Sequence, residues 1–245
     1  MSRTAIDLNA DLGEGSPHDA ELMPLVSSAN VCCGVHAGSV DLMATTVRLA
    51  IQHGVAVGAH PGHADRGHFG RRELAITPVD AVALVARQVE AVAAVAGAAL
   101  HHVKLHGGLY HQAGREPALA MALADWLADR WPRLVVYAPA ASGLALAARS
   151  RGLAVAAEAF IDRRYRADGT LAARSEPGAS IDDPAAAAEQ AVRLATGGLV
   201  HTLDAADVRV AADTLCIHGD GPRAVEVATT VRRALAAAGI AIRPA

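Results

Sequence analysis

Short apolar segments alternate with longer amphipathic segments along most of the chain. Seven of the short segments have the composition of β-strands: AIDLN, SANVCC, VAVGA, HHVKL, LVVYA, LAVAA and TLCIH. The longer segments between them repeat apolar residues at helical spacing. Because strands that alternate with helices pair in parallel, this order predicts an α/β fold with a parallel sheet and helices outside it.

Capping residues mark the ends of several helical segments. Three helices are bounded in this way, from Asp41 to Gly54, from Thr77 and Pro78 to Gly97, and from Asp183 and Pro184 to Gly197 and Gly198. Apolar periodicity predicts three more helices, over residues 116–130, 142–151 and 222–238. The segment VHTLDAADVRVA, residues 200–211, is expected to form a β-hairpin before the last strand.

Length and composition indicate one domain over residues 1–245. The chain has 245 residues, 52% of them hydrophobic, which suits a single undivided (β/α) barrel. A net charge of −3 with scattered signs offers no basic face for nucleic acid and no polybasic signal for a membrane. The first 15 residues lack the apolar centre of a signal peptide, and three cysteines fit a reducing compartment, so we expect a cytoplasmic protein.

Polar clusters follow six of the predicted strands: DLNADLGE, CGVHAG, GAHPG, KLHGG, EAFIDRRY and HGDG. In a sheet of this kind the carboxyl ends of the strands meet on one face, where the loops that leave them build the active site. Four histidines stand at this end of their strands: His36, His60, His106 and His218. Their joint placement predicts a pocket, and the glycines that follow them are expected to let the backbone approach a ligand.

Lys104 is the only lysine in a chain whose other 21 basic residues are arginine. Side chains two residues apart on a strand share a face, so Lys104 and His106 should point the same way, as should Asp7, Asn9 and Asp11. A lysine in a partly dry site favours a neutral neighbouring imidazole, and its own pKa can be lowered. We therefore expect acid and base chemistry at this position.

The six clusters, in their order and spacing, resemble the LamB/YcsF family. The longer motifs that carry the resemblance are DLNADLGE, SANVCCGVHAG, GAHPGHADRGHFGRR, HVKLHGGLY, EAFIDRRYRADGTLAARS and TLCIHGDG, and it extends over nearly the whole chain. The resemblance implies a seven-stranded (β/α) barrel of the glycoside hydrolase and deacetylase type. It also implies ATP-dependent ring opening of 5-oxo-L-proline to L-glutamate, performed together with B and C partner subunits.

The resemblance and the strand-end positions together give a set of candidate site residues. The catalytic candidates are Asp11, His60, Lys104, His106 and Glu158. The candidates for substrate binding are Asn9, Glu14, Asn30, His36, Arg71, Asp162, Arg163, His218 and Asp220. In the hypothesis, Lys104 binds the anionic oxygens, with Arg163 as a second candidate for this role. Asp11 or Glu158 serves as the base, and His106 or His60 moves the proton.

ATP, expected as its Mg²⁺ complex, has no recognisable loop in this sequence. The chain lacks both G-x-x-x-x-G-K-[ST] and a G-x-G-x-x-G turn after a strand. Two alternatives stay open: partner subunits activate the lactam, or the phosphates are held by scattered arginines such as Arg71, Arg72, Arg163, Arg164 and Arg174.

Two other functions compete with this one. Asp11, His36 and His60 could bind a divalent metal such as Zn²⁺, which would make the chain a metal-dependent amide or carbohydrate deacylase. The chain could instead be a non-catalytic subunit that binds the lactam, although about a dozen titratable groups exceed the two or three that a binding pocket needs.

Overall fold

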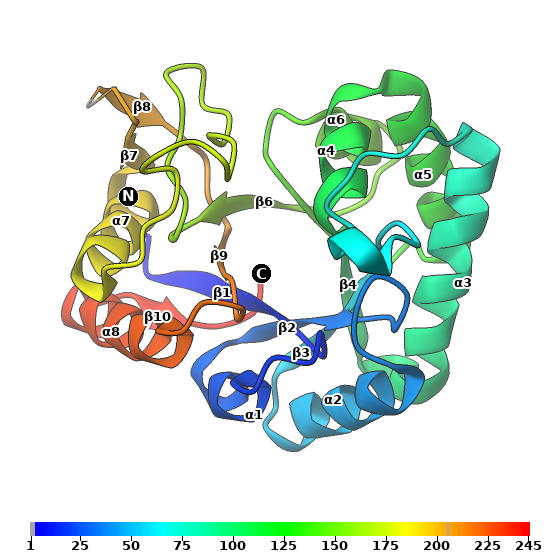
Figure 1. Ribbon diagram of the computed structural model, residues 1–245, viewed down its shortest axis with the longest axis horizontal. Helices are drawn as coiled ribbons and strands as arrows, with labels where there is room; N and C mark the ends of the chain where they lie inside the picture. Colours follow the sequence, from blue (N-terminus) through cyan, green and yellow to red (C-terminus); the bar gives the residue numbers. More distant parts are fainter. Residues whose placement is uncertain (1–2, 205) are drawn as a thin grey trace.

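The computed structural model describes residues 3–204 and 206–245, and its centre is a closed barrel of seven parallel strands (Figure 1). Neighbouring strands follow the chain order: β1 (Ala5–Leu12), β2 (Ser28–Cys32), β3 (Ala56–His60), β4 (Leu100–Lys104), β5 (Val135–Ala138), β6 (Val155–Phe160) and β9 (Thr214–Ile217). The barrel closes where β9 pairs in parallel with β1, with Asp7 opposite Thr214 and Asn9 opposite Cys216. The predicted seven-stranded (β/α) barrel is confirmed.

Helices cover the outside of the barrel (Figure 1). They are α2 (Val40–Gln52), α3 (Pro78–Ala96), α4 (Gly107–Arg115), α5 (Pro117–Arg130), α6 (Gly143–Ser150), α7 (Pro184–Gly197) and α8 (Ala224–Ala237). The side chains of Thr77 and Asp183 cap α3 and α7, as the sequence predicts. The predicted cap of α2 is wrong: Ser39 accepts the bond from the Leu42 amide, and Asp41 lies within the first turn.

Several short elements were not expected from the sequence. They are α1 (Asp19–Leu22), η1 (Met23–Leu25), η2 (Arg66–His68), η3 (Gly97–Ala99) and β10 (Ala241–Ile242), which pairs with the start of β1. Helix α4 was also not predicted, because it begins with Gly107 and Gly108 and glycine has low helix propensity. The predicted hairpin is confirmed as β7 (Leu199–His201) paired antiparallel with β8 (Asp207–Arg209), although Ala205 within it lies outside the described residues.

The inside of the barrel is polar, whereas the apolar core lies between the strands and the helices. The Asp7 carboxylate accepts hydrogen bonds from the hydroxyls of Ser27, Ser28 and Thr214 at 2.6, 2.8 and 2.5 Å. Burial raises the pKa of Asp7, and these hydroxyls oppose that effect. Buried polar groups persist only when their hydrogen bonds are satisfied, and here they form a connected network across the barrel.

Helix α3, with the turn that follows it, is the one helix among the described residues that is long and apolar enough to cross a membrane. Over Pro78–Ala99 its mean hydropathy reaches 1.5. One such helix is weak evidence for a span, because core helices of globular proteins have the same length and composition. In this fold α3 packs against β3 and β4 with Val85, Val89 and Val92 buried, as a barrel helix does.

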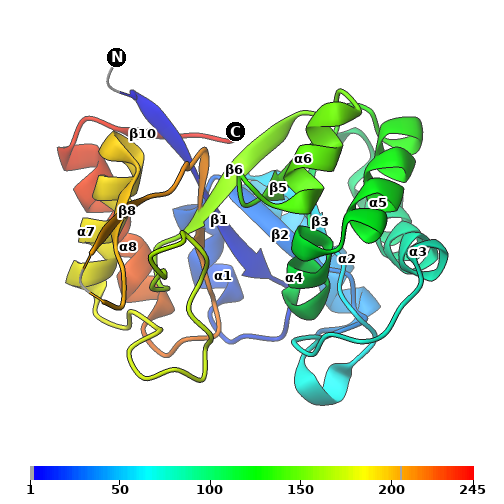
Figure 2. The same cartoon turned by 90° about the horizontal axis from the view of Figure 1, so that it is seen from above.

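The chain termini and the strand-end loops lie at opposite ends of the barrel. Figure 2 shows both termini at one end of the barrel, where β1 begins, and the long loop after β6 at the opposite end. The loops that leave the carboxyl ends of the strands therefore gather at the end away from the termini. This is the end at which the sequence predicts a pocket.

Candidate active site

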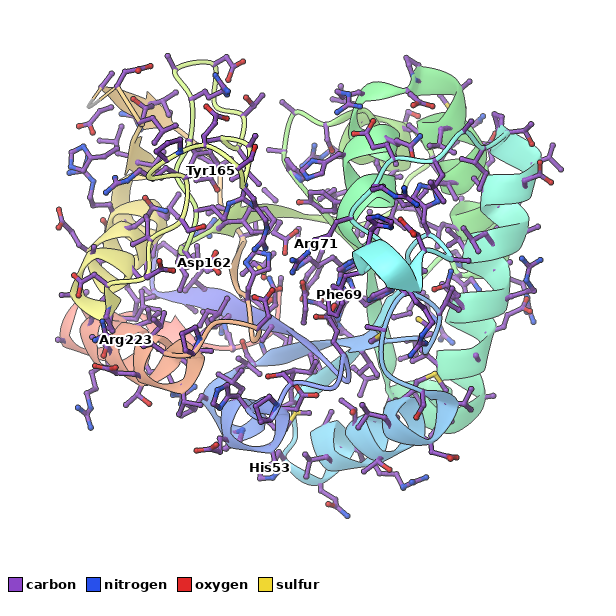
Figure 3. The ribbon with its side chains drawn as sticks, in the orientation of Figure 1. His53, Phe69, Arg71, Asp162, Tyr165 and Arg223 are labelled. Carbon is purple, nitrogen blue, oxygen red and sulfur yellow. The ribbon has the colours of Figure 1, made fainter. Side chains whose placement is uncertain are left out.

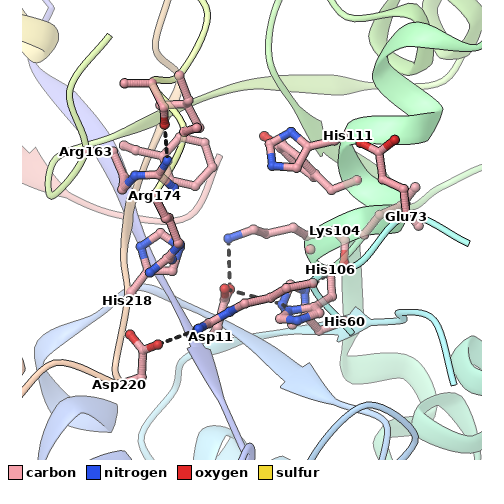
Figure 4. Close-up of a pocket in the computed structure, with 18 of the residues that line it drawn as sticks. Asp11, His60, Glu73, Lys104, His106, His111, Arg163, Arg174, His218 and Asp220 are labelled. Carbon is pink, nitrogen blue, oxygen red and sulfur yellow. Dashed lines mark hydrogen bonds and ion pairs between the residues drawn. The ribbon is translucent and has the colours of Figure 1, made fainter. Parts of the chain in front are cut away.

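A cavity of about 480 Å³ opens at the carboxyl ends of the strands (Figure 4). Its lining combines acidic, basic and imidazole groups, and includes Asp11, Glu14, His60, Arg71, Glu73, Lys104, His106, Tyr110, His111, Arg115, Phe160, Arg163, Arg166, Arg174, His218 and Asp220. These residues come from β1, β3, β4, β6, helix α4 and the loops that follow β1, β3, β4, β6 and β9. The structure thus brings side chains from distant motifs into one site.

Lys104 lies at the floor of this cavity and is surrounded by acceptors. Its ammonium is 2.8 Å from Asp11 Oδ1 and 2.9 Å from Glu158 Oε1, and it donates to Cys216 Sγ at 3.1 Å. The side chain is only 3% exposed. A buried charge of this kind requires paired and hydrogen-bonded neighbours, and Lys104 has both.

The charge of Lys104 is fixed by these neighbours. Although burial opposes the charged form, Asp11, Cys216 and Glu158 hold the pKa of Lys104 well above its usual value. The expectation of a lowered pKa is therefore wrong, because the carboxylates outweigh the loss of solvation. In the same way His60 and Lys104 overcome the effect of burial and hold the pKa of Asp11 well below its usual value. The pair is an ammonium and a carboxylate at neutral pH.

Asn9 and Asn30 lie beneath the cavity and do not line it. Asn30 Nδ2 donates to Asn9 Oδ1 at 2.7 Å and to Asp11 Oδ1 at 2.8 Å, and both asparagines are fully buried. His102 Nε2 contacts Asn30 Oδ1 at 2.9 Å from the far side. These contacts fix the orientation of the Asp11 carboxylate, so that its Oδ2 is left to face His60 at 3.3 Å.

Three imidazoles meet one carboxylate beside Asp11. Glu14 Oε1 is 3.2 Å from His36 Nε2, 3.4 Å from His106 Nδ1 and 3.9 Å from His60 Nε2. The rings of His36 and His106 are stacked at 3.8 Å between centroids. Burial, followed by the neighbouring imidazoles, lowers the pKa of His106 to about 3, and burial and His60 lower the pKa of His36 to about 3. These two imidazoles are therefore neutral.

The sequence-based metal set of Asp11, His36 and His60 is only partly reproduced. One ligand atom from each of Glu14, His36, His60 and His106 lies within 4.8 Å of the others. Asp11 instead belongs to a second possible group, with Cys216 and His218. The possible metal-binding group therefore contains His36 and His60 as predicted, but with Glu14 and His106 and without Asp11.

The outer nitrogens of two of these imidazoles are anchored to the backbone. His60 Nδ1 donates to the Lys104 carbonyl at 2.9 Å, and His106 Nε2 donates to the Phe69 carbonyl at 2.8 Å. Phe69 has φ 56°, the one positive φ among the described residues other than glycine. Figure 3 shows Phe69 and Arg71 in the centre of the molecule, and the left-handed backbone turns the Phe69 carbonyl toward His106.

Basic side chains surround the mouth of the cavity. Arg71 forms an ion pair with Asp220, and Arg115, Arg166 and Arg174 also line the wall. Figure 4 shows Arg163, Arg174 and Asp220 on this wall. Arg163 is 5% exposed; it donates to the Ala172 carbonyl, but its Nε has no hydrogen-bond partner in the described structure. Burial, followed by the nearby Arg174, lowers the pKa of Arg163. An anion at this wall would supply the missing acceptor.

Asp162 supports the site from behind. Its Oδ2 accepts from the backbone amide of His218 at 3.0 Å and lies 2.7 Å from the Nδ1 of the same residue. His218 stacks on Phe160 and lines the cavity, whereas Asp162 does not. Asp162 therefore sets the position of His218.

The glycines of the strand-end motifs have a different role from the expected one. A Cβ on Gly107 would lie 2.6 Å from the Gly70 carbonyl oxygen, and one on Gly108 would lie 2.2 Å from the Arg72 carbonyl oxygen. A Cβ on Gly62 would lie 2.9 Å from His36 Nδ1. These glycines let neighbouring strand-end loops pack against one another and against the imidazoles. Gly107 also lines the cavity, so the expected approach of backbone to a ligand stays a prediction.

The candidate residues fall into two layers. Those that line the cavity are Asp11, Glu14, His60, Arg71, Lys104, His106, Arg163, His218 and Asp220. Those that lie behind the lining are Asn9, Asn30, His36, Glu158 and Asp162. Glu158 is enclosed because Tyr110 donates to its Oε2 at 2.7 Å and Lys104 meets its Oε1.

Sequence reasoning did not select Cys216, Tyr110 or Phe69. Cys216 lies on β9 two residues before His218, which directly follows the strand, so continued strand alternation could have placed both on one face. The sequence around Tyr110 gives no signal of helix α4, which brings its hydroxyl to Glu158. The left-handed backbone of Phe69 likewise has no signal in the sequence, because residues other than glycine rarely adopt it.

Comparison with known proteins shows the family of this chain. Residues 6–245, which include every side chain named in the site, match the sequence profile of the LamB/YcsF family. The chain belongs to the LamB/YcsF family.

Relatives of this LamB/YcsF protein match it over nearly their whole length. A protein of Thermus thermophilus, named as the A subunit of 5-oxoprolinase, is 49% identical over 97% of this chain and 98% of its own. A protein of the same name from Heliobacterium modesticaldum is 46% identical, over 97% of each chain. At this level of identity and coverage the common fold extends from end to end.

Solved structures place the LamB/YcsF barrel among known folds. The crystal structure of a lactam utilization protein from Thermus thermophilus matches with a TM-score of 0.90 and 46% identity, over 98% of this chain and 99% of that one. A family 4 carbohydrate esterase from Streptomyces lividans matches with a TM-score of 0.52 and 11% identity, over 99% of this chain and 93% of that one. The second match concerns the fold alone and confirms the deacetylase-type barrel.

Proposed function

We propose that this chain is the A subunit of an ATP-dependent 5-oxoprolinase, which opens the lactam ring of 5-oxo-L-proline to give L-glutamate. Membership of the LamB/YcsF family and the names of its full-length relatives support this activity. The observation that carries the proposal is the Lys104 ammonium held between Asp11 and Glu158 at the floor of an arginine-lined cavity. A small anionic amide suits such a cavity in both charge and size.

The chemistry explains why a buried cation is needed. A five-membered lactam is a poor electrophile, because attack on its carbonyl carbon costs the resonance of the amide. Transfer of a phosphoryl group from ATP to the lactam oxygen gives an imidate-like phosphate that water can attack. As water adds, the C=N electron pair moves to the ring nitrogen, which takes up a proton; phosphate and the ring nitrogen then leave the former carbonyl carbon. A fixed cation in a water-poor site stabilises the anionic phosphate oxygens during these steps. Lys104 has the charge and burial for this role.

Geometry favours Asp11 over Glu158 as the carboxylate that contacts the attacking water. Both Glu158 oxygens are already occupied, by Tyr110 and Lys104, and the residue does not line the cavity. Asp11 lines the cavity, and its Oδ2 faces His60 at 3.3 Å. We assign Asp11 to orient the attacking water and His60 to exchange a proton with it, while His106 holds His60 in place at 2.9 Å.

The arginines at the mouth suit the anionic part of the reactants. Arg163, with its unpartnered Nε, and Arg174 are the first candidates for the carboxylate of 5-oxoproline or for a phosphate. These groups fit a phosphate, but the sequence offers no loop for the remainder of a nucleotide. We therefore place Mg²⁺-ATP binding and lactam activation with B and C partner subunits, in a cytoplasmic complex.

Reconstitution tests the proposal. The purified chain should release L-glutamate from 5-oxo-L-proline only when partner subunits and ATP are present, with ADP formed in equal amount. Omission of ATP, of the partners or of this chain provides the three controls. Full turnover by the partners without this chain would contradict the proposal, and so would glutamate release that does not consume ATP.

A further inference from the structure

The three imidazoles and Glu14 do more than the proposed reaction requires. Their four donor atoms converge from the loop after β1, the loop after β2, the end of β3 and the loop after β4. Only His60 has a role in the proposed proton transfer. The Lys104 ammonium pairs with Asp11 and Glu158, and Asp11 Oδ2 in turn lies 3.3 Å from His60 Nε2, so the group adjoins the Lys104 pair.

The spacing of these donors is that of a small coordination sphere. Tetrahedral ligands at the usual Zn–N and Zn–O distances lie about 3.4 Å from one another. Glu14 Oε1 lies 3.2 Å from His36 Nε2, 3.4 Å from His106 Nδ1 and 3.9 Å from His60 Nε2. Small side-chain shifts would therefore admit one ion at the point where the four atoms meet.

Hydrogen-bond directions leave lone pairs pointing inward. Backbone carbonyls can only accept, so His60 Nδ1 and His106 Nε2 must both carry hydrogen. Were both rings neutral, His60 Nε2 and His106 Nδ1 would present lone pairs to each other at 2.9 Å, and His60 Nε2 also lies 3.3 Å from Asp11 Oδ2. Such an arrangement needs a cation between the rings, either a proton or a metal ion. Anchoring of the outer nitrogen is also the usual arrangement for a metal-binding histidine.

Charge balance favours a divalent ion over a proton. Three buried carboxylates, of Asp11, Glu14 and Glu158, surround the floor of the cavity, and the one ammonium among them is that of Lys104. A proton shared by the two imidazoles would neutralise one of the two remaining negative charges, whereas a divalent ion at Glu14 would neutralise both. Buried charges are paired or coordinate metals, so the second arrangement suits this site better.

The second possible group is a poorer site. Lys104 already donates to Cys216 and pairs with Asp11, so its ammonium occupies the position that a metal would need. Burial also raises the pKa of Cys216, although Lys104 opposes that effect, and metals bind the thiolate. A cation beside Lys104 would be repelled.

We propose that Glu14, His36, His60 and His106 bind one divalent transition-metal ion, with Zn²⁺ as the best match to three imidazoles and a carboxylate. Glu14, His60 and His106 line the cavity, so the ion would be accessible from it. When bound there, such an ion would supply Lewis-acid polarisation of a carbonyl or an acidified water. The inference rests on the donor geometry and does not depend on the identity of the substrate.

Metal binding by the isolated chain tests the proposal. After chelator treatment and dialysis, the full chain should bind about one Zn²⁺ by calorimetry, and elemental analysis should find the same ratio. The variants Glu14→Gln and His106→Gln should each weaken binding by at least about tenfold. His53→Gln, which changes an exposed histidine beyond α2, is the matched control and should leave affinity unchanged.

Cobalt distinguishes the two possible positions without any variant. Co²⁺ in the Glu14 site has nitrogen and oxygen ligands, so its spectrum should show ligand-field bands without thiolate-to-cobalt charge transfer. Charge-transfer bands that disappear in Cys216→Ser would place the metal at the second group and overturn the proposal. A chain that binds neither Zn²⁺ nor Co²⁺ while circular dichroism shows it folded would overturn it as well.

Discussion

At the scale of single residues, the arrangement of acceptors around position 104 suits a lysine better than an arginine. Its ammonium is enclosed by Asp11, Glu158 and Cys216 at 2.8, 2.9 and 3.1 Å. A compact ammonium with three donors fits three acceptors around one point, whereas a planar guanidinium is larger and fixed in its donor directions. The chain uses arginine at its other basic positions, most of which are more exposed.

Removal of the Lys104 charge should abolish most of the turnover. Lys104→Met keeps the aliphatic stem and loses the cation, and loss of one charge-stabilising donor typically costs about 100- to 1000-fold in rate. The measurement is ATP-dependent glutamate release by the reconstituted complex, with circular dichroism to show that the variant folds.

Tyr110→Phe is the comparison for this variant, because Tyr110 also contacts Glu158 but is neutral. Tyr110→Phe removes one hydrogen bond to the Glu158 carboxylate but leaves the Lys104 cation in place, so turnover should fall much less than in Lys104→Met. Equal losses in the two variants, or a folded Lys104→Met with nearly full activity, would contradict the role of the cation.

Asp19 should make stability depend on pH. Burial raises the pKa of Asp19 to about 6, although its Oδ2 accepts from the Gly13 amide at 2.9 Å. The folded chain therefore holds this proton more tightly than the unfolded chain, whose carboxyl has the ordinary pKa of 3.8. Stability from this group is greatest below the unfolded value and falls as pH rises from there through about 6.

Asp19→Asn tests this effect because asparagine retains an acceptor oxygen. The free energy of unfolding of the variant minus that of the parent should be more favourable to the variant at pH 7.5 than at pH 4. The expected change in this difference is about 1 kcal/mol, because partial exposure screens the charge. Urea unfolding at the two pH values measures the difference. A gain of equal size at both pH values would assign the effect to something other than ionisation.

At the scale of elements, the strand-end loops support one another through glycines that pack against backbone. Helix α4 begins at Gly107 and Gly108, whose missing side chains leave room for residues 70–73 of the loop after β3. Two buried glutamines also hold the strand-end loops. Gln88 on α3 forms hydrogen bonds with both the amide and the carbonyl of Gly62. Gln190 on α7 donates to the carbonyl oxygens of Phe160 and Arg163. The outer helices thereby hold the loops that carry the site.

Gly108→Ala should destabilise the fold through this contact. The new Cβ would lie 2.2 Å from the Arg72 carbonyl oxygen and 2.9 Å from the Glu73 amide nitrogen, and both are backbone atoms with little freedom to move. Overpacking of this kind costs about 1–3 kcal/mol. Urea unfolding measures the change.

Gly197→Ala, at the end of α7, is the matched control because no heavy atom lies within 4 Å of its added Cβ. We expect a change within about 0.5 kcal/mol or a small gain, since alanine favours the helix. If the two substitutions lower the free energy of unfolding equally, loop packing against the start of α4 does not explain the destabilisation by Gly108→Ala.

At the scale of the whole molecule, the barrel closes through polar contacts between its first and last strands. Thr214 on β9 donates to Asp7 at 2.5 Å and accepts from Asn9 Nδ2 at 2.6 Å, both on β1. The residue is fully buried. One hydroxyl therefore satisfies two polar groups at the seam of the barrel.

Thr214→Val should weaken this closure, because the two β1 side chains would each lose a partner in a buried site. The expected cost is about 1–3 kcal/mol for each unsatisfied group. Thr214→Ser keeps the hydroxyl and removes one methyl group, at a cost of about 1 kcal/mol. Thermal unfolding compares the two, and a serine variant less stable than the valine variant would contradict the hydrogen-bond argument.

The sequence by itself determined the barrel and the end of the barrel that carries the site. Strand and helix periods are local properties, so the seven strands and caps such as Thr77 could be read from the order of residues. The alternation of β1 likewise placed Asp7, Asn9 and Asp11 on one face, as the structure has them.

Only the tertiary structure decided which side chains meet. The raised pKa of Lys104, the left-handed Phe69 and the gathering of Glu14 with three histidines each depend on groups that are distant in the chain. Their energies come from burial and from charges across the barrel, and neither a local period nor the spacing of a motif contains these quantities.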